Sequence, residues 1–335
     1  MAFDFFVTSD WHIGSGKTLF DNILQKQIDE IHKIYQQALD MGISYIIIPG
    51  DISDTTNIST SEMIALVKLF SFYDKKITTY YIGGNHDYHS SNKSSVDLLK
   101  HLVNEKMFKT LYVITEPEHT VIEGVPVNFL PFPHTQLPST KTGCINFVHM
   151  DTSGAVADNG LEIKLKTDTD FGTDNVTISG HVHMYQYIKS KRWLYCGNPY
   201  QKKFGEALPK GFLHCTAKHK DGIIKFGHKF IDNKPDFILK TVKINTLSDL
   251  SKLKSGNNVA YKLIPEEGLL LPSDISTKYN VASVHTKFVS NLAKIEKNST
   301  ITTGLKSFCA DRELSESMIK SAIKKVQDAR EQYCI

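Results

Sequence analysis

Aspartate, histidine and asparagine residues gather at a few ordered points of the sequence, and each point directly follows an apolar run. They are Asp10 and His12 after "FDFFVTS", Asp51 after "YIIIPG", Asn85 after "TTYYIGG", His149 after "INFV", and His181 and His183 after "VTISG". Seven ligands are too many for one tetrahedral ion, but they fill two four-ligand shells if Asp51 bridges. Mixed nitrogen and oxygen donors without thiolate suit Mn²⁺, Fe²⁺ or Zn²⁺ better than Mg²⁺ or Ca²⁺. The pattern predicts a centre for two divalent ions.

Such a centre would favour phosphate-ester hydrolysis. Two divalent ions carry more positive charge than Asp10 and Asp51 cancel, and the remainder suits a phosphate ester. Paired ions about 3.5–4 Å apart activate water and clamp the attacking and leaving oxygens. An isolated H-x-H or D-x-H can equally be structural, and nine of the fourteen histidines fit no motif. The prediction therefore rests on five strand ends in order, each of which carries ligand types.

The elements that must position these residues follow from the hydrophobic pattern. Three segments each begin as a buried strand: residues 3–10, 44–51 and 77–87. Residues 28–41 repeat apolar positions at helical spacing, which predicts a first helix. A second helix is predicted after Ser59, which can form a capping box with Glu62. Alternating strands and helices predict an α/β sheet whose strands end at one edge. Ligands of open α/β sheets bind beyond that edge.

The sequence pattern changes at about residue 111. From there, short apolar segments separated by Gly and Pro predict a second sheet packed on the first. We expect three parts: a catalytic domain over 1–235, a smaller α+β capping domain over 236–293, and a linker with an amphipathic helix over 294–335. The apolar stripe of that helix would pack on the capping domain or dock into a partner groove.

The composition argues against several classes of protein. The 335 residues carry a net charge of only +3, no apolar run approaches a membrane span, and the five cysteines form no C-x-x-C pair. No signal peptide is evident, so we expect a cytoplasmic protein and no membrane association. Only three of 39 basic residues are arginines, so any DNA binding should be blind to sequence.

Five motifs, "DWHIG", "GDISD", "GGNHD", "VHM" and "SGHVH", together resemble the calcineurin-like metallophosphoesterases over about residues 1–230. The resemblance implies a four-layer α/β/β/α sandwich. It also implies that one ion is held by Asp10, His12, Asp51 and His183, and the other by Asp51, Asn85, His149 and His181. His86 matches the catalytic histidine of the family, and Asp54 matches the residue that pairs with it.

Two later segments, "LYCGNPYQKKFGE" and "KGFLHCTAKHKDG", resemble SbcD-type nucleases, the relatives of the meiotic recombination eleven nuclease. That resemblance implies a Mn²⁺-dependent DNA exonuclease and endonuclease in replication, recombination and repair. It further implies a homodimer bound to an SbcC-like (Rad-fifty type) SMC-family ATPase, which the terminal helix would contact. "SDTTN" stands where protein phosphatases carry Asp-Arg-Gly, which argues against that branch.

Candidate DNA contacts are the cations that flank the site-bearing strands, namely Lys93, Lys189, Lys191, Arg192, Lys202 and Lys203. Two other classes remain open. One is a small-molecule phosphodiesterase or nucleotidase whose extra domain acts as a lid. The other is a binding scaffold that has lost activity, which the complete ligand set disfavours.

Overall fold

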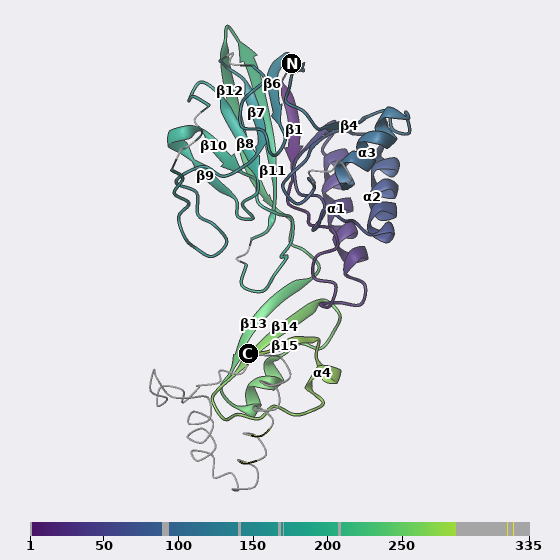
Figure 1. The fold of residues 1–335 in the computed structure, drawn as a ribbon, viewed down its shortest axis with the longest axis vertical. Helices are drawn as coiled ribbons and strands as arrows, with labels where there is room; N and C mark the ends of the chain where they lie inside the picture. The colour runs from purple at the N-terminus through teal and green to yellow at the C-terminus, as the bar shows by residue number, and fades with distance from the viewer. Residues whose placement is uncertain are drawn as a thin grey trace.

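The computed structural model describes residues 2–88, 94–139, 142–166, 169, 171–206 and 209–285, together with Lys320 and Lys324. Two six-stranded sheets pack face to face, and three helices cover the outer face of the first sheet (Figure 1). A small third sheet lies beyond one end of this sandwich (Figure 1). The expected α/β class is confirmed.

The first sheet carries the strands that precede the first three ligand groups. Its order is β12-β11-β1-β2-β3-β4, with β1 Phe3–Val7, β2 Tyr45–Pro49, β3 Thr78–Ile82, β4 Leu111–Ile114, β11 Gly211–Lys220 and β12 Ile223–Asp232. β1 to β4 are parallel, whereas β11 is antiparallel to β1 and forms a long hairpin with β12. The ends of β1, β2 and β3 therefore lie at the same edge.

The covering helices are α1 Ile23–Asp40, α2 Thr60–Tyr73 and α3 Ser95–Asn104. α1 begins five residues before the predicted start at residue 28, and its apolar face, Ile31, Ile34 and Ala38 included, is fully buried against the sheet. The capping box predicted for α2 is present, because the Ser59 hydroxyl accepts the Glu62 N–H and the Glu62 carboxylate accepts the Ser59 N–H.

The second sheet supplies the remaining histidines. Its order is β5-β6-β7-β8-β10-β9, with β5 Glu118–Ile122, β6 Val125–Leu130, β7 Ile145–His149, β8 Val176–Gly180, β9 Gln186–Ile188 and β10 Trp193–Tyr195. Phe5 of the first sheet meets Phe147 of the second edge to face, at 5.9 Å between ring centroids. Each such buried side chain contributes about 1.5–3 kcal/mol, so this shared apolar layer fixes the two sheets against each other.

The prediction of a fourth layer, made of helices, is wrong. Between residues 105 and 235, the only helical element in the described part is the 3-10 turn η1, Lys189–Lys191. The outer face of the second sheet is instead covered by the chain after β7, where Phe171 stacks on Trp193 at 5.7 Å. In that segment Leu161, Ile163 and Leu165 alternate, and Gly160 turns the chain at φ 81°, so the sequence lacks the period of an amphipathic helix.

The third sheet consists of three parallel strands, β13 Ile238–Ile244, β14 Val259–Pro265 and β15 Val281–Val284, with the short helices η2 Leu247–Lys252 and α4 Ile275–Lys278. It has an apolar core of its own. It is also fastened to the sandwich, because Lys26 Nζ donates to Asn258 at 2.6 Å and the Leu239 N–H donates to Gln201 at 2.9 Å.

The predicted terminal helix lies outside the described residues, apart from Lys320 and Lys324, which are helical and exposed. The last eight residues of the expected capping domain, 286–293, also lie outside them. No helix within the described ranges is both long and apolar enough to cross a membrane.

Candidate metal centre

The loops that leave β1 and β2 are joined by backbone hydrogen bonds, and the loop after β8 is joined to them through the Asp10 carboxylate. The Asp10 N–H donates to Gly50 O at 3.1 Å, and the His12 N–H donates to Asp51 O at 3.0 Å. From the second sheet, the His181 N–H donates to the Asp10 carboxylate at 2.9 Å. Ligands from both sheets therefore meet at one edge of the sandwich.

Four of the seven predicted ligands have a left-handed backbone, which non-glycine residues rarely adopt. The φ angles are 54° at Asp10, 45° at His12, 55° at Asp51 and 85° at His181. Such conformations cost of order 1–3 kcal/mol each and persist where the surrounding structure imposes them, typically at functional sites. Each sharp turn aims its side chain away from the strand direction and into the shared edge.

Asp10, His12 and His183 form the first ligand cluster. One carboxylate oxygen and two imidazole nitrogens lie within 4.8 Å of one another. The Nε2 atoms of His12 and His183 face each other at 3.1 Å. Asp10 and His12 are fully buried.

Asn85, His149 and His181 form the second cluster. Asn85 Oδ1 lies 2.9 Å from His149 Nε2 and 2.9 Å from His181 Nδ1. Asp51 lies between the clusters, since its Oδ2 is 3.4 Å from His149 Nε2 and 3.7 Å from His12 Nε2. This is the position that a bridging carboxylate requires.

Two glycines let these groups approach. A Cβ at Gly84 would lie 2.1 Å from Asp51 Oδ1, and one at Gly50 would lie 2.2 Å from His149 Nδ1. Gly50 also has a φ of 96°, so any side chain there would be both crowded and strained. Gly50 of "PGD" and Gly84, the second glycine of "GGNHD", are therefore required by packing around these side chains.

Buried carboxylates and imidazoles in the centre shift the pKa values of one another. Burial alone would lower the pKa of His149, but the neighbouring Asp51 carboxylate raises it to about 10. Burial would raise the pKa of Asp51, yet the charges of His149, His12 and His86 hold it well below its usual value. The pKa of His12 is lowered, chiefly by burial. Buried carboxylates that hold imidazoles in this way create the field in which a cation is stable.

The donor set fits two divalent ions. Two imidazole nitrogens converge in the first cluster, a neutral amide oxygen faces two imidazole nitrogens in the second, and a carboxylate lies between them. None of the three described cysteines, which are all buried, belongs to these clusters. Oxygen and imidazole ligands of this kind hold Mn²⁺, Fe²⁺ or Zn²⁺.

His86 lies beside the clusters and is partly buried. Its ring meets that of His12 edge to face at 4.6 Å, and its backbone N–H donates to Asp51 at 2.9 Å. Its Nδ1 lies 2.6 Å from the backbone oxygen of Asp54. Because a carbonyl only accepts, Nδ1 carries the proton, and the unprotonated nitrogen of the neutral ring is Nε2.

Asp54 contacts His86 through a different group from the one expected. Its backbone oxygen contacts His86, whereas its carboxylate lies 3.4 Å from His12 Nδ1 and 3.0 Å from Lys202 Nζ. Burial would raise the pKa of Asp54, but the hydrogen bonds with His12 and Lys202 lower it to about 2. The carboxylate therefore orients His12, and the backbone carbonyl orients His86.

The sequence analysis did not identify the carboxylates that lie next to His183. Asp158 lies 2.8 Å from His183 Nδ1, and Glu206 lies 3.7 Å from the same atom. The buried Lys210 pairs with Glu206 at 2.8 Å and donates to the His183 carbonyl at 3.1 Å. Carboxylates in this position orient metal-binding histidines. No local motif marks them, because 23 to 25 residues of chain separate them from His183.

Asp87 binds the ends of β2 and β3 together, since its carboxylate accepts the N–H groups of Ser53 and Gly84. Burial raises its pKa. Asp151 lies 3.4 Å from His181 Nε2. Both residues support the ligands.

The candidate DNA contacts are mostly engaged inside the protein. Lys202 lies in the centre itself, and Lys203 pairs with Asp158 at 3.3 Å. Lys191 donates to Thr152, and the Arg192 guanidinium donates to the Thr173 carbonyl. Four of the six predicted DNA contacts thus also have partners within the protein. Lys189 is exposed, and Lys93 lies outside the described residues.

The chain is similar to several known proteins. A curated relative, an uncharacterised protein of Acanthamoeba polyphaga mimivirus, is 22% identical across 88% of this chain and 24% of its own length, so the chain spans about a quarter of that relative. Among solved structures, the Plasmodium inner-membrane-complex anchor GAP50 aligns with TM-score 0.42 and 12% identity over 70% of this chain and 85% of its own.

A dimetal phosphatase from Danio rerio aligns with TM-score 0.41 and 10% identity over 69% of this chain and 99% of its own. The nuclease MPE of Pseudomonas putida aligns with TM-score 0.33 and 13% identity over 63% and 82%. The family model of the calcineurin-like phosphoesterases matches residues 3–195, which is more than half of the chain and includes every predicted metal ligand. The protein belongs to the calcineurin-like phosphoesterases, a family of metal-dependent hydrolases.

Proposed function

We propose that this protein is a di-manganese DNA nuclease of the SbcD type, an exonuclease on duplex ends and an endonuclease on single strands. One observation carries the proposal. The segment 194–206, which resembles SbcD-type nucleases, forms a wall of the metal centre. Tyr200 donates to the Trp11 carbonyl, Lys202 reaches His12 and Asp54, and Glu206 supports His183.

The accessibility of the centre also supports a polymeric substrate. The side chains of His181 and Asp151 are 33% and 36% exposed, whereas Asp10 and His12 are fully buried. The deep groups hold the cluster, and the outer ones face solvent. A phosphodiester within a chain could therefore approach without its flanking nucleotides entering the protein.

Two divalent ions held by the seven ligands would supply Lewis acidity and positive charge for phosphodiester hydrolysis. His86 acts at the leaving oxygen through Nε2, because Nδ1 is fixed on the Asp54 carbonyl. To donate a proton there, the ring must first carry a proton on Nε2. Lys202 and Asp54 hold His12 in place.

The wider assembly forms part of the same proposal. A homodimer would place two centres on one DNA, the third sheet would position the duplex, and the terminal segment would bind an SbcC-like ATPase. The attachment of the third sheet through Asn258 and Leu239 gives it a fixed place beside α1 and the 194–206 segment.

The test is hydrolysis of end-labelled linear duplex DNA by the purified protein with Mn²⁺, with and without a candidate ATPase. We expect metal-dependent release of nucleotides, abolished by EDTA and by Asp51→Asn. Cyclic nucleotides assayed in parallel test the small-molecule alternative. Turnover of cyclic nucleotides without DNA cleavage would refute the nuclease assignment.

A further inference from the structure

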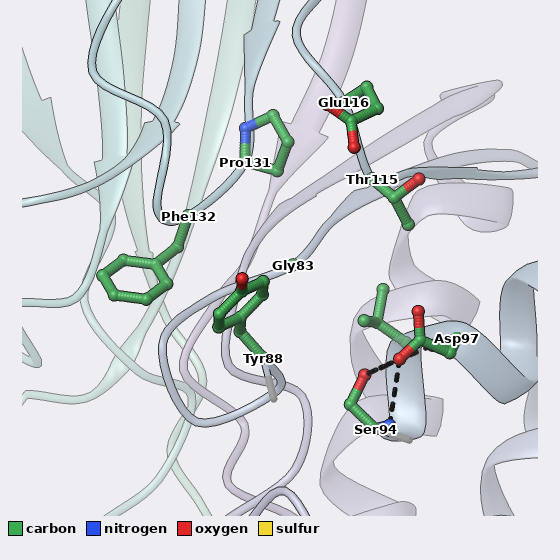
Figure 2. Close-up of a pocket in the computed structure, with 9 residues that line it drawn as sticks. Gly83, Tyr88, Ser94, Asp97, Thr115, Glu116, Pro131 and Phe132 are labelled. Atoms are coloured by element: carbon green, nitrogen blue, oxygen red, sulfur yellow. Dashed lines mark hydrogen bonds between the residues drawn. The ribbon is translucent and has the colours of Figure 1, made fainter. Parts of the chain in front are cut away.

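A small cavity lies directly beside the segment that carries Asn85 and His86. It encloses about 160 Å³ and is bounded by Gly83, Tyr88, Asp97, Glu116, Pro131 and Phe132 (Figure 2). Pockets for drug-sized ligands measure roughly 300–1,000 Å³, so this one suits a single ring system. None of these residues is a metal ligand.

Two exposed aromatic rings dominate the cavity. Tyr88 is 38% exposed and Phe132 is 36% exposed. Their ring centroids are 5.7 Å apart, and the planes are inclined at 70°. Figure 2 shows the Tyr88 ring in view between Phe132 and the start of α3. Aromatic faces left open in this way provide a surface on which a planar ligand can stack.

The charges of the cavity exclude a phosphate. Its lining includes the carboxylates of Asp97 and Glu116 and no lysine or arginine. The first turn of α3 is already closed by its own capping box, in which Asp97 accepts the N–H and hydroxyl of Ser94. Glu116 is 80% exposed and lies 3.3 Å from His134. The cavity therefore accepts an uncharged, planar group with hydrogen-bond donors.

The cavity and the hydrolytic centre are rigidly connected. Tyr88 follows His86 by two residues, and the Phe132 N–H donates to Gly83 O at 3.0 Å. Gly84, next along the chain, packs directly on Asp51. One segment of chain thus carries Asn85 and His86 of the centre and Tyr88 of the cavity, with a single residue between His86 and Tyr88.

We propose that Tyr88 and Phe132 form a stacking site for one nucleobase of the substrate, next to the scissile phosphodiester. The inference rests on the proposed function and narrows it, because a base can stack here only when it is unpaired. The site thus selects frayed ends or single strands. Stacking of one base on aromatic side chains is worth roughly tenfold to a hundredfold in affinity.

The test compares two single-stranded oligonucleotides of equal length, one natural and one with an abasic tetrahydrofuran residue at the cleaved end. With Mn²⁺, the intact protein should give a kcat/KM at least tenfold higher for the natural end. In the variant Tyr88→Ala/Phe132→Ala this ratio should fall toward one. A purely structural defect would lower both rates and leave the ratio unchanged, which would overturn the proposal.

Controls separate the chemistry of the ring from its position. Tyr88→Phe should keep the ratio, because stacking needs the ring and not the hydroxyl. Tyr112→Ala, at a tyrosine 46% exposed on β4, should also keep it. If Tyr88→Ala/Phe132→Ala instead converts a dimer into a monomer in sedimentation, the rings belong to a protein interface and the proposal fails.

A binding measurement separates this inference from the nuclease assignment. Saturation-transfer NMR on metal-free protein should show transfer to 2′-deoxyadenosine and none to deoxyribose, and the double variant should lose the transfer. If the nucleoside binds but no nucleic acid is cleaved, the stacking site stands and the nuclease assignment fails. Equal transfer in wild type and double variant would refute the stacking site.

Discussion

Replacement of Lys210 by methionine should destabilise the sandwich strongly, although Lys210 binds no metal and lies on no catalytic path. Its side chain is only 1% exposed, and its ammonium pairs with Glu206, also 1% exposed, at 2.8 Å. Methionine fills nearly the same space but removes the charge. Glu206 would then be a buried carboxylate left with the N–H of Lys202, the amide of Asn198 and, at 3.7 Å, His183 Nδ1.

The size of the effect follows from this geometry. Loss of one partner from a buried ion pair typically costs about 3–5 kcal/mol, whereas removal of both can be nearly neutral. Against a total stability of about 5–15 kcal/mol, Lys210→Met should remove a large part. The double variant Glu206→Gln/Lys210→Met should recover more than about 1 kcal/mol of that loss.

Denaturant unfolding monitored by tryptophan fluorescence measures these free energies for the relevant domain. The chain has two tryptophans, Trp11 and Trp193, and both are buried in the sandwich. Unfolding in EDTA isolates the ion pair from metal binding. A cost below about 1 kcal/mol for Lys210→Met, or strictly additive single variants, would refute the reasoning that the pair is buried and coupled.

Four further outcomes are expected. Asp54→Ala should weaken Mn²⁺ binding about 10–100-fold in calorimetry because it removes the support of His12, and unchanged affinity would contradict that role. His86→Ala should lower hydrolysis about 10²–10⁴-fold while calorimetry shows both ions still bound; loss of an ion would make His86 a ligand. Burial would raise the pKa of Asp74, but hydrogen bonds from the backbone of Thr110 and Lys109 lower this pKa in the folded protein. The ionised carboxylate therefore stabilises the fold above the pKa of the unfolded chain, and this stabilisation is lost as the pH falls through the pKa of the folded state. Asp74→Asn should therefore cost about 0.5 kcal/mol or less at pH 7, because the carboxylate is largely solvated and screened, and little near pH 2, in urea unfolding at both pH values. Finally, DNA affinity should fall roughly tenfold between about 50 and 200 mM salt for about two phosphate contacts, equally for unrelated sequences; a preference that persists at high salt would count against it.

That the candidate ligand side chains gather at one edge of the sandwich could be predicted from the sequence, because strand ends are a local signal. An apolar run followed by glycine and a ligand type, as at Asp51 and Asn85, marks both the strand and the edge where it ends. The parallel connection then brings separate ends together without any further information. The structure places all seven predicted ligands in two adjoining clusters.

Other features could not be predicted in this way, because they depend on contacts between distant segments. The direction of the Asp54 carboxylate is set by Lys202 and His12, which lie on two other loops. Asp158 comes from an irregular segment with no motif, and only the folded chain brings it to His183. The missing helical layer has a local cause that sequence reasoning overlooked, the alternating apolar pattern around Ile163.

The left-handed turns explain why the centre is built on the edge of two packed sheets. Asp10, His12 and Asp51 are each held in a costly conformation, and their side chains place buried charges near one another. Backbone hydrogen bonds between the β1 and β2 loops impose the turns, and the apolar layer between the sheets prevents the loops from relaxing. Folding of the sandwich thus supplies the free energy that holds these side chains in place, so metal binding needs little rearrangement. Substitutions in that apolar layer, such as at Phe147, should therefore weaken metal binding without touching a ligand.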